Sequence, residues 1–447
     1  MSDHSSLANE LAEKLKRREA TLGVIGLGYV GLPICLAASS AGIKVIGFDI
    51  DPAKSDHITR GKSYLKHIPD APIREQIDRK LLSATTDFAR LVETDALLIC
   101  VPTPLTAHLE PDLSFVESTG RSIAKHLRRG QLVILESTTY PGTTKDVLQP
   151  ILETSGLRCD EDFFIAFSPE REDPGNPDFT TARIPKVVGA DSEGARKAAL
   201  ALYGSFLEKT VEVSSLATAE AVKLTENIFR AVNIALVNEL KVIYDAMGVD
   251  IWEVIDGAKT KPFGFMPFYP GPGLGGHCIP IDPFYLTWKA REYGIATRFI
   301  ELAGEINSAM PRRVVDILAQ AIDRRAGKGL TTSRILMLGV AYKKNTDDTR
   351  ESPALRLIDM LEERGATVDF YDPFVSVIPH TREHKNLSGR KSIVWKAEDI
   401  AAYDAALVVT DHDGVDYRAL VTNSRLVVDT RNACRKAGAH ADHIVQA

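Results

Sequence analysis

A glycine-rich turn between two apolar segments constrains the fold of this chain more than any other feature of its sequence. The apolar segment 22–25 leads into the pattern G-x-G-x-x-G, with its glycines at Gly26, Gly28 and Gly31. An alanine-rich segment at 32–41 follows, and then a second apolar segment, K-V-I-G-F-D-I-D. A lone G-x-G-x-x-G is weakly diagnostic, but this succession of strand, turn, helix, strand and acid gives the pattern its meaning. It predicts a Rossmann-type unit in a parallel α/β sheet.

The same turn predicts a dinucleotide cofactor. Its glycines would provide the tight turn, the close approach to a pyrophosphate and the close packing of helix on strand. The pyrophosphate would lie at the helix N-terminus, where backbone N–H groups and the helix dipole favour an anion. Asp49 would accept hydrogen bonds from the adenosine ribose and repel a 2′-phosphate, so we expect NAD rather than NADP. The alternative is a glycine-rich turn with a purely structural role.

Three further apolar segments continue the predicted sheet. They occupy 96–101, 132–138 and 163–170, and helical patterns separate them. Nearly continuous hydrophobicity of this kind is typical of parallel strands that are buried on both faces. The polar sequences V-P-T-P, E-S-T-T-Y-P-G-T-T and S-P-E-R-E-D-P-G-N stand at their ends. Such sheets bind ligands beyond the carboxyl ends of their strands, so we expect these sequences at the ligand-binding edge.

A second strand–turn–helix–strand unit occurs in the C-terminal part of the chain. The sequences R-I-L-M-L-G-V-A-Y-K, S-P-A-L and T-V-D-F-Y-D-P repeat the order of the first unit, with Gly339 near the position of Gly26. The later glycines are replaced by a sequence that offers the cations Lys343, Lys344 and Arg350. Cations suit a diphosphate that backbone amides do not hold. We therefore interpret this region as a degenerate nucleotide-binding unit.

The longest helical pattern, 218–247, lies between the two units and contains neither glycine nor proline. At 1.5 Å per residue it would be about 45 Å long, which is enough to bridge two domains. Lys223 and Asn227 are four residues apart and therefore share one face of this helix. From the residues alone, a solvated side chain is the default interpretation of Lys223.

The segment 270–282, P-G-P-G-L-G-G-H-C-I-P-I-D, is the strongest candidate for chemistry. Glycine and proline disfavour a helix or a central strand, so we expect a loop that brings backbone close to a ligand. Cys278 lies within this loop, and a thiolate in such a position is a nucleophile. The alternative is a rigid turn that carries a packed cysteine.

Composition argues against several classes of partner. The net charge of −6 gives no indication of a nucleic-acid partner. No apolar run approaches the ~18 residues of a membrane span, and the charged N-terminal segment lacks the apolar core of a signal peptide. The five cysteines form no C-x-x-C pair and no even disulfide set, which suits free thiols in a reducing cytosol. We expect a cytoplasmic protein with no membrane partner and no metal site.

A series of motifs runs in order from about Leu22 to Ala433: G-L-G-Y-V-G, V-P-T-P, E-S-T, S-P-E, K-L-T-E-N, G-G-H-C-x-P-x-D and Y-K-x-x-x-D-D-T-R-E-S. Taken together, these motifs resemble the UDP-glucose/GDP-mannose dehydrogenase family. The resemblance implies an α/β fold of two Rossmann-like doubly wound domains joined by a long central helix. It also implies the four-electron oxidation of the C-6 alcohol of a nucleotide sugar to a carboxylate. Two NAD⁺ would be reduced, by way of a cysteine thiohemiacetal and a thioester.

The resemblance also assigns roles to individual residues. Its catalytic residues are the nucleophile Cys278, Lys223 and Asn227 to stabilise charge on the C-6 oxygen, Asp282 for protons or water, and Thr138 and Glu170 for hydrolysis. Its cofactor residues are Gly26, Gly28, Tyr29, Val30, Gly31, Asp49, Lys54, Thr103, Thr138 and Arg350. Its nucleotide-sugar residues are Glu170, Arg171, Lys223, Asn227, Tyr269, Gly273, Gly275, Tyr342, Lys343 and Arg431. His277 is a weaker candidate for tuning the thiol.

Departures from the family pattern bear on the substrate. Relatives acting on UDP-glucose commonly have G-G-S-C-x-x-K-D, whereas this chain has His277 before the cysteine and Ile281 in place of the lysine. These features resemble the branch that handles UDP-N-acetylhexosamines. We therefore expect UDP-N-acetylglucosamine as the substrate, with UDP-glucose and then UDP-N-acetylmannosamine as alternatives. Two alternatives of other classes are a one-step dehydrogenase of the 6-phosphogluconate type and a non-catalytic NAD and sugar-nucleotide sensor.

The resemblance predicts three domains and a homo-oligomer. We expect an NAD-binding domain at 1–205, a helical dimerisation domain with the cysteine loop at 206–315, and a UDP-sugar-binding domain at 316–447. In relatives the long helix forms the dimer core. We therefore expect at least a homodimer.

Overall fold

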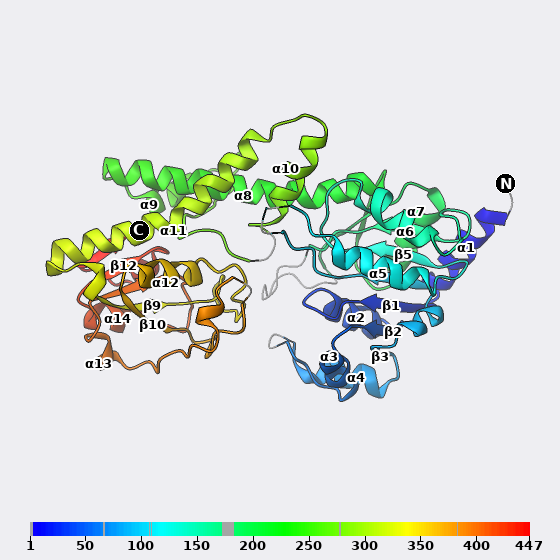
Figure 1. Cartoon of the computed structure of the whole chain (residues 1–447), viewed down its shortest axis with the longest axis horizontal. Coiled ribbons are helices and arrows are strands. Elements are labelled where there is room, and N and C mark those ends of the chain that lie inside the picture. Colours follow the sequence, from blue (N-terminus) through cyan, green and yellow to red (C-terminus); the bar gives the residue numbers. More distant parts are fainter. Residues whose placement is uncertain are drawn as a thin grey trace. The chain divides into compact units, whose positions relative to one another are not determined.

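The computed structural model describes residues 3–65, 68–106, 108, 110–171, 183–276, 279–381 and 383–447. They form two compact units, one of Met1–Glu226 with Phe284–Ile295 and the other of Asn227–Pro283 with Ala296–Ala447. Each unit is built around one sheet with helices on both faces (Figure 1).

The sheet of the first unit has eight strands within the described residues, in the order β3-β2-β1-β4-β5-β6-β7-β8. They are β1 (Thr21–Ile25), β2 (Lys44–Phe48), β3 (Leu82–Thr85), β4 (Ala96–Ile99), β5 (Leu132–Leu135), β6 (Phe164–Phe167), β7 (Lys186–Gly189) and β8 (Thr210–Val213). Neighbours are parallel except for the antiparallel contact of β6 with β7. The strand order reverses between β1 and β4, and ligands of doubly wound sheets bind at such a switch point.

Helices cover both faces of this sheet (Figure 1). They include α1 (Asp3–Lys16), α2 (Gly31–Ser40), α3 (Pro52–Thr59), α4 (Asp70–Asp78), α5 (Ser114–Ala124), α6 (Gln149–Glu153) and α7 (Glu193–Gly204). Leu11, Ala38 and Leu202 bring α1, α2 and α7 into the core on one face. Val116 and Leu152 bring α5 and α6 into the core on the other. Burial on both faces explains the nearly continuous apolar strand sequences.

The second unit contains a parallel sheet in the order β10-β9-β11-β12-β13. Its strands are β9 (Arg334–Leu338), β10 (Thr367–Tyr371), β11 (Ala405–Val408), β12 (Val427–Asp429) and β13 (Ile444–Gln446). Helices α11 (Arg298–Ala326) and α12 (Pro353–Glu363) contribute to the core on one face. The core on the other face includes α13 (Ala397–Ile400), α14 (Tyr417–Asn423) and α15 (Ala433–Lys436). The predicted second Rossmann-like unit is therefore confirmed.

The predicted long helix is α8 (Leu216–Met247), and the boundary between the two units falls within it. Two shorter helices follow, α9 (Ile251–Ala258) and α10 (Asp282–Glu292). In the part of the chain that the structure describes, no helix has the length and apolar character needed to cross a membrane.

Candidate active site

The turn after β1 has the geometry that its glycines predicted. Gly26 has a φ of +93°, which disfavours any side chain, and its N–H donates to the Phe48 carbonyl at 2.8 Å. A Cβ at Gly31 would lie 1.9 Å from the carbonyl oxygen of Gly26. Glycine at Gly31 therefore lets the start of α2 pack directly against the turn.

The space around this turn fits a pyrophosphate. A Cβ at Gly28 would meet no described atom within 4 Å, so this side of the backbone is open. The N-cap of α2, Val30, has an apolar side chain that cannot cap the N–H groups of the first helical turn. Helix N-termini of this kind bind phosphate through backbone N–H groups, to which Tyr29 and Val30 would contribute.

The acid at the end of β2 lies beside the turn. Asp49 is buried, and its carboxylate accepts hydrogen bonds from the N–H of Leu27 at 2.8 Å and of Asp51 at 3.0 Å. Lys54 forms an ion pair with the same carboxylate at 2.8 Å. An ionised carboxylate has about four acceptor positions, so one remains for a ribose hydroxyl.

Two further predicted loops of the first unit are covered by residues of α10. The Tyr285 hydroxyl is buried and donates to the carbonyl oxygen of Thr103 at 2.9 Å. Tyr140, in the loop that carries the half-buried Thr138, packs against Trp288 with a ring-centroid distance of 5.1 Å. These aromatic contacts hold the loops after β4 and β5 at the carboxyl edge of the sheet.

The loop after β6 presents Glu170 and Arg171. One oxygen of the Glu170 carboxylate accepts the N–H of Arg171 at 2.7 Å, and the other lies 3.2 Å from Nζ of Lys186. The guanidinium of Arg171 pairs with Glu226 on α8 at 2.7 Å. Arg171 is thus engaged by the chain itself, in the loop that carries Glu170.

Two predicted catalytic residues of the second unit are in direct contact. The amide of Asn227 donates to the carboxylate of Asp282 at 2.5 Å, and both side chains are buried. Lys223, one turn earlier on α8, is 8 % exposed. The default interpretation of Lys223 as a solvated surface lysine is therefore wrong. His277 and Cys278 lie outside the described residues.

The glycine loop that leads to Cys278 packs against the predicted nucleotide-sugar residues of the second unit. A Cβ at Gly271 would lie 2.6 Å from the Arg431 guanidinium, and one at Gly275 would lie 2.7 Å from the Cβ of Tyr342. The N–H of Gly276 donates to the carbonyl oxygen of Arg350 at 3.1 Å. These close approaches need residues without a side chain.

Other predicted nucleotide-sugar and cofactor residues lie within this loop or elsewhere in the second unit. A Cβ at Gly273 would lie 3.3 Å from Pro353, the first residue of α12. Tyr269 stacks on Trp252 at 5.4 Å, while Lys343 is half-buried. The exposed Arg350 makes a two-pronged contact with Asp348. The structure therefore places Gly273, Gly275, Tyr342, Arg350 and Arg431 within or beside one loop of the second unit.

Two buried amides anchor the same loop. The side chain of Asn238, on α8, accepts the N–H of Gly271 at 3.0 Å and donates to Asn307, on α11, at 2.9 Å. The amide of Asn307 then donates to the carbonyl oxygen of Ala231 at 3.0 Å. Both side chains are almost completely buried, so their hydrogen bonds fix the loop backbone relative to two helices.

The turn after β9 has the same backbone geometry as the turn after β1, but the acid beside it has different neighbours. Gly339 has a φ of +82°, and its N–H donates to the Tyr371 carbonyl at 2.9 Å. The acid after β10, Asp372, accepts the N–H of Val340 at 2.7 Å. Its carboxylate also lies 3.1 Å from Nε2 of His412, and both side chains are fully buried.

Several of these residues were not predicted from the sequence. Lys186, Asn238, Asn307 and His412 carried no motif. Only Lys186 could have been noticed in the sequence, because it is a charged residue at the start of an apolar strand. The partners of all four are more than fifteen residues away along the chain, so the fold alone brings them together.

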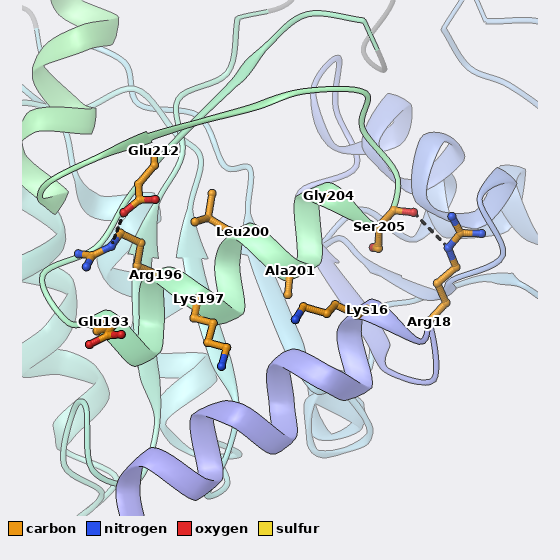
Figure 2. A pocket seen from close by; sticks show the side chains of 10 residues that line it. All are labelled: Lys16, Arg18, Glu193, Arg196, Lys197, Leu200, Ala201, Gly204, Ser205 and Glu212. Atoms are coloured by element: carbon orange, nitrogen blue, oxygen red, sulfur yellow. Dashed lines mark hydrogen bonds and ion pairs between the residues drawn. The ribbon is translucent and has the colours of Figure 1, made fainter.

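A hollow of about 620 Å³ in the first unit is separate from these residues (Figure 2). It lies between α1 and α7, and none of the predicted site residues lines it. Arg18 donates there to the carbonyl oxygen of Ser205 at 3.1 Å. No described residue of the loops after β1, β4, β5 and β6 lines this hollow, and those loops form the expected ligand edge of the sheet.

The first Rossmann-like unit contains a turn suited to a dinucleotide, and the second contains a loop that carries cations. These features define the class of the protein as a two-unit NAD-dependent dehydrogenase. The chain belongs to the UDP-glucose/GDP-mannose dehydrogenase family. The NAD binding domain of that family matches residues 20–207, its central domain 217–309 and its UDP binding domain 336–436. The protein is thus an NAD-dependent nucleotide-sugar dehydrogenase, and the predicted family, fold class and cofactor are confirmed.

Individual relatives are similar over most of their length. A UDP-N-acetyl-D-mannosamine dehydrogenase of Pyrococcus horikoshii is 35 % identical over 93 % of this chain and 96 % of that protein. A UDP-N-acetyl-D-glucosamine 6-dehydrogenase of Pseudomonas aeruginosa is 37 % identical over 80 % of this chain and 84 % of that protein. The solved structure of a UDP-D-ManNAc dehydrogenase from Pyrococcus horikoshii superposes with a TM-score of 0.84, at 34 % identity, covering 95 % of this chain and 98 % of that one.

Proposed function

We propose that the protein oxidises the C-6 alcohol of UDP-N-acetylglucosamine to the uronic acid, using two NAD⁺ and Cys278 as nucleophile. The observation that carries this proposal is the buried contact of Asn227 with Asp282, four residues beyond the cysteine. The loop that precedes the cysteine in the sequence packs against Tyr342 and Arg431. Charge-stabilising, proton-handling and nucleotide-binding groups thus meet at the loop of the nucleophile.

Each residue has a task in the first oxidation. NAD⁺, when bound, accepts a hydride in each of the two oxidations. Lys223 and Asn227 share one face of α8, and both stabilise the negative charge that develops on the C-6 oxygen. The buried carboxylate of Asp282 holds Asn227 in place and is available for the proton released from the alcohol. The product of this step is an aldehyde.

Cys278 retains that aldehyde. Its thiolate adds to the carbonyl carbon, the oxygen takes up a proton, and a thiohemiacetal forms. Loss of a second hydride and of the hydroxyl proton gives a thioester. Water then adds to the thioester, the C–S bond breaks, and the free acid and the thiol are released. Thr138 and Glu170 assist this last step by orienting water and accepting its proton.

UDP-N-acetylmannosamine is the second candidate substrate. Similarity to relatives that carry this sugar in their names favours it, as does the solved structure with a TM-score of 0.84. Similarity to a UDP-N-acetylglucosamine 6-dehydrogenase at 37 % identity supports the first candidate. Both are N-acetylhexosamines, in keeping with the departures from the UDP-glucose pattern around His277 and Ile281.

Product stoichiometry tests the mechanism. With UDP-N-acetylglucosamine we expect two NADH for each sugar consumed and no free aldehyde. Cys278→Ser should keep substrate binding and lose essentially all turnover. Cys159→Ser, at a free and half-buried thiol, is the matched control and should keep normal turnover. One NADH per sugar, or near-normal activity of Cys278→Ser, would exclude the thioester route.

Steady-state kinetics on three purified sugar nucleotides tests the substrate. We expect kcat/KM to be highest for UDP-N-acetylglucosamine and lower for UDP-glucose by about 10- to 200-fold, the discrimination that one small group provides. A higher kcat/KM for UDP-N-acetylmannosamine would establish the second candidate. A preference for UDP-glucose would reject both.

We further propose a homodimer that works in the cytosol. Phe229, Leu236 and Ile243 lie seven residues apart on α8, and each is between 45 % and 50 % exposed. Such a spacing forms one apolar stripe along a helix, which a second copy of the chain would cover. Sedimentation velocity at micromolar concentration should give a dimer or a larger oligomer. Leu236→Glu should shift the protein towards monomer, and a monodisperse monomer before mutation would contradict the assembly.

A further inference from the structure

A buried lysine of the first unit connects two carboxylates. Nζ of Lys186, at the start of β7, lies 2.7 Å from the Glu136 carboxylate and 3.2 Å from that of Glu170. Glu136 also accepts a hydrogen bond from the hydroxyl of Tyr203, on α7. The Lys186 ammonium lies over the ring of Tyr203, 5.5 Å from its centre.

The two carboxylates differ in their access to solvent. Glu136 is 1 % exposed and belongs to the interior of the unit, whereas the side chain of Glu170 is 14 % exposed. Burial disfavours the charge of Lys186, but Glu136 and Glu170 outweigh it and raise the pKa of the lysine above its usual value. Lys186 therefore stays protonated and supplies the positive charge beside both carboxylates.

Both oxygens of Glu170 are directed by the chain. One accepts the N–H of Arg171 at 2.7 Å, and the other faces Lys186. The first contact depends on the backbone N–H of Arg171, which every substitution except proline would retain. The second involves the side chain of Lys186. Substitution of Lys186 can therefore alter the orientation and charge of Glu170 without a change in the sequence of the loop that carries Glu170.

We propose that Lys186 is a positioning residue that holds Glu170 ionised and oriented for hydrolysis of the thioester. This inference rests on the proposed function. In that step water loses a proton to Glu170 as its oxygen attacks the thioester carbon, and the C–S bond breaks to release the Cys278 thiolate. An ionised Glu170 can accept the proton, and a protonated one cannot.

Among the described residues, the other charged and titratable groups around this cluster are two acids, a thiol, a phenol and one arginine that pairs elsewhere. Glu136 is a second carboxylate, and Cys100 has a thiol whose pKa burial raises well above its ordinary value. The pKa of the Tyr203 hydroxyl is also raised, first by burial and then by Glu136. Arg171 directs its guanidinium to Glu226. Loss of Lys186 would therefore remove the ammonium group that contacts both carboxylates.

The test is the pH dependence of hydrolysis in Lys186→Met. A single turnover with excess enzyme, quenched at intervals, gives the rate at which protein-bound sugar becomes free uronic acid. A neighbouring cation typically lowers a carboxyl pKa by about one to three units. We therefore expect the acidic limb of this rate to move to higher pH by about one to three units. The rate of the first NADH formed should keep its profile.

Two variants serve as controls. Lys186→Arg keeps the charge and should restore the original acidic limb. Lys145→Met removes a lysine from an exposed ion pair with Asp191 in the same unit and should leave hydrolysis unchanged. If Lys186→Met does not fold, the double variant Glu136→Gln with Lys186→Met also removes the interior carboxylate that Lys186 pairs with. The same shift is expected, because the Lys186 ammonium beside Glu170 is still absent.

The possible failures are distinguishable. An acidic limb that coincides with that of the unmodified enzyme, in a folded variant that still binds NAD⁺, would overturn the role of Lys186. A limb that Lys186→Arg fails to restore would also overturn it. If the unmodified enzyme forms no covalent sugar adduct and Cys278→Ser turns over normally, the proposed function itself is wrong.

Discussion

The two Rossmann-like units share one turn geometry, although they match the NAD binding domain and the UDP binding domain of the family. In each, a glycine with positive φ follows the first strand and donates its N–H to the end of the second strand, at 2.8 Å for Gly26 and 2.9 Å for Gly339. In each, an acid after the second strand accepts the next N–H, Leu27 to Asp49 and Val340 to Asp372. The backbone of the turn is therefore common to both units.

The chain beyond the turn differs between the two units. In the first unit α2 begins at Gly31, and the Asp49 carboxylate keeps one acceptor position beside its three contacts. In the second unit α12 begins only at Pro353, after a long loop that carries Lys343 and Arg350. Asp372 is surrounded by hydrogen-bond donors of its own chain: the N–H groups of Val340, Ala341, Phe374 and Val375, and His412. The first turn thus combines open glycine backbone with an acid that keeps one acceptor position, whereas the acid of the second turn is occupied by donors of its own chain.

The largest expected effect comes from closing the first turn. Gly31→Ala would place a methyl group 1.9 Å from the carbonyl oxygen of Gly26, so the turn must open. We expect NAD⁺ affinity to fall by about 100-fold or more, equivalent to about 3 kcal/mol, while UDP binds as before. Calorimetric titration with each ligand measures both. Gly204→Ala, where a Cβ meets no described atom within 4 Å, is the control, and an equal loss there would contradict the steric argument.

Asp372, the acid of the second unit, should contribute to the free energy of unfolding but not to the affinity for NAD⁺. Asp372→Asn breaks the buried contact with His412. It also places the NH₂ group of an amide, which is a donor, beside backbone N–H groups that are donors themselves. We expect a loss of about 3 kcal/mol in unfolding free energy and weaker UDP binding, with NAD⁺ affinity unchanged. Denaturant unfolding with both titrations tests this. Weaker NAD⁺ binding and normal UDP binding would reverse the assignment of the two units.

The pH dependence of stability should also differ between the units. Burial alone would raise the pKa of Asp372, but His412 lowers it below its usual range, so its contribution is lost as pH falls. Glu220, on α8 in the first unit, is fully buried and accepts two N–H groups, of Gly142 and Thr144. Burial raises the pKa of Glu220 from 4.5 to about 7.

For Glu220 the sign is opposite. The folded state binds the proton more tightly than the unfolded state, so stability falls as pH rises from 4.5 to about 7. The total change is at most about 3 kcal/mol, at 1.36 kcal/mol per pKa unit. Glu220→Gln should flatten this dependence when denaturant unfolding is compared at several pH values across that range. An unchanged slope in the variant would assign the pH dependence to other groups.

The smallest expected effect concerns cofactor choice. Asp49→Ala removes the carboxylate that opposes a 2′-phosphate, so the preference for NAD⁺ over NADP⁺ should fall by about tenfold, equivalent to about 1.4 kcal/mol. The ratio of kcat/KM for the two cofactors measures it. Asp51→Ala, at the neighbouring exposed acid, should leave the ratio unchanged. Equal rates of the unmodified enzyme with both cofactors would show that Asp49 does not face the ribose.

Local patterns predicted the elements of this fold well. The turn at Gly26, the helix from near Thr218 to Met247 and the second unit at Gly339 are all confirmed, because spacing and glycine conformation act over short stretches of chain. The antiparallel contact of β6 with β7 was not predicted, because pairing direction depends on how a connection returns to the sheet. The three proposed domain boundaries and the roles of the site residues stay predictions.

Supporting residues of the candidate site were beyond such reasoning. Glu136 and Lys186 are 50 residues apart, Asp372 and His412 are 40 apart, and Asn238 and Asn307 are 69 apart. These pairs meet because particular strands and helices are neighbours, which periodicity within one segment does not reveal. Resemblance had supplied the residues expected to touch ligand, whereas the residues that hold them required the three-dimensional structure.

The close packing of the cysteine loop on the second unit has an evolutionary consequence. The Arg431 guanidinium lies where a side chain at Gly271 would have to be, and Tyr342 lies where one at Gly275 would be. Neither position of such a pair can change independently, since a larger residue in the loop would clash with its neighbour. In an alignment of descendants of a common ancestor, substitutions at 271 should accompany those at 431, and substitutions at 275 those at 342. Independent variation at these positions would mean that the loop has more freedom among relatives than its packing here allows.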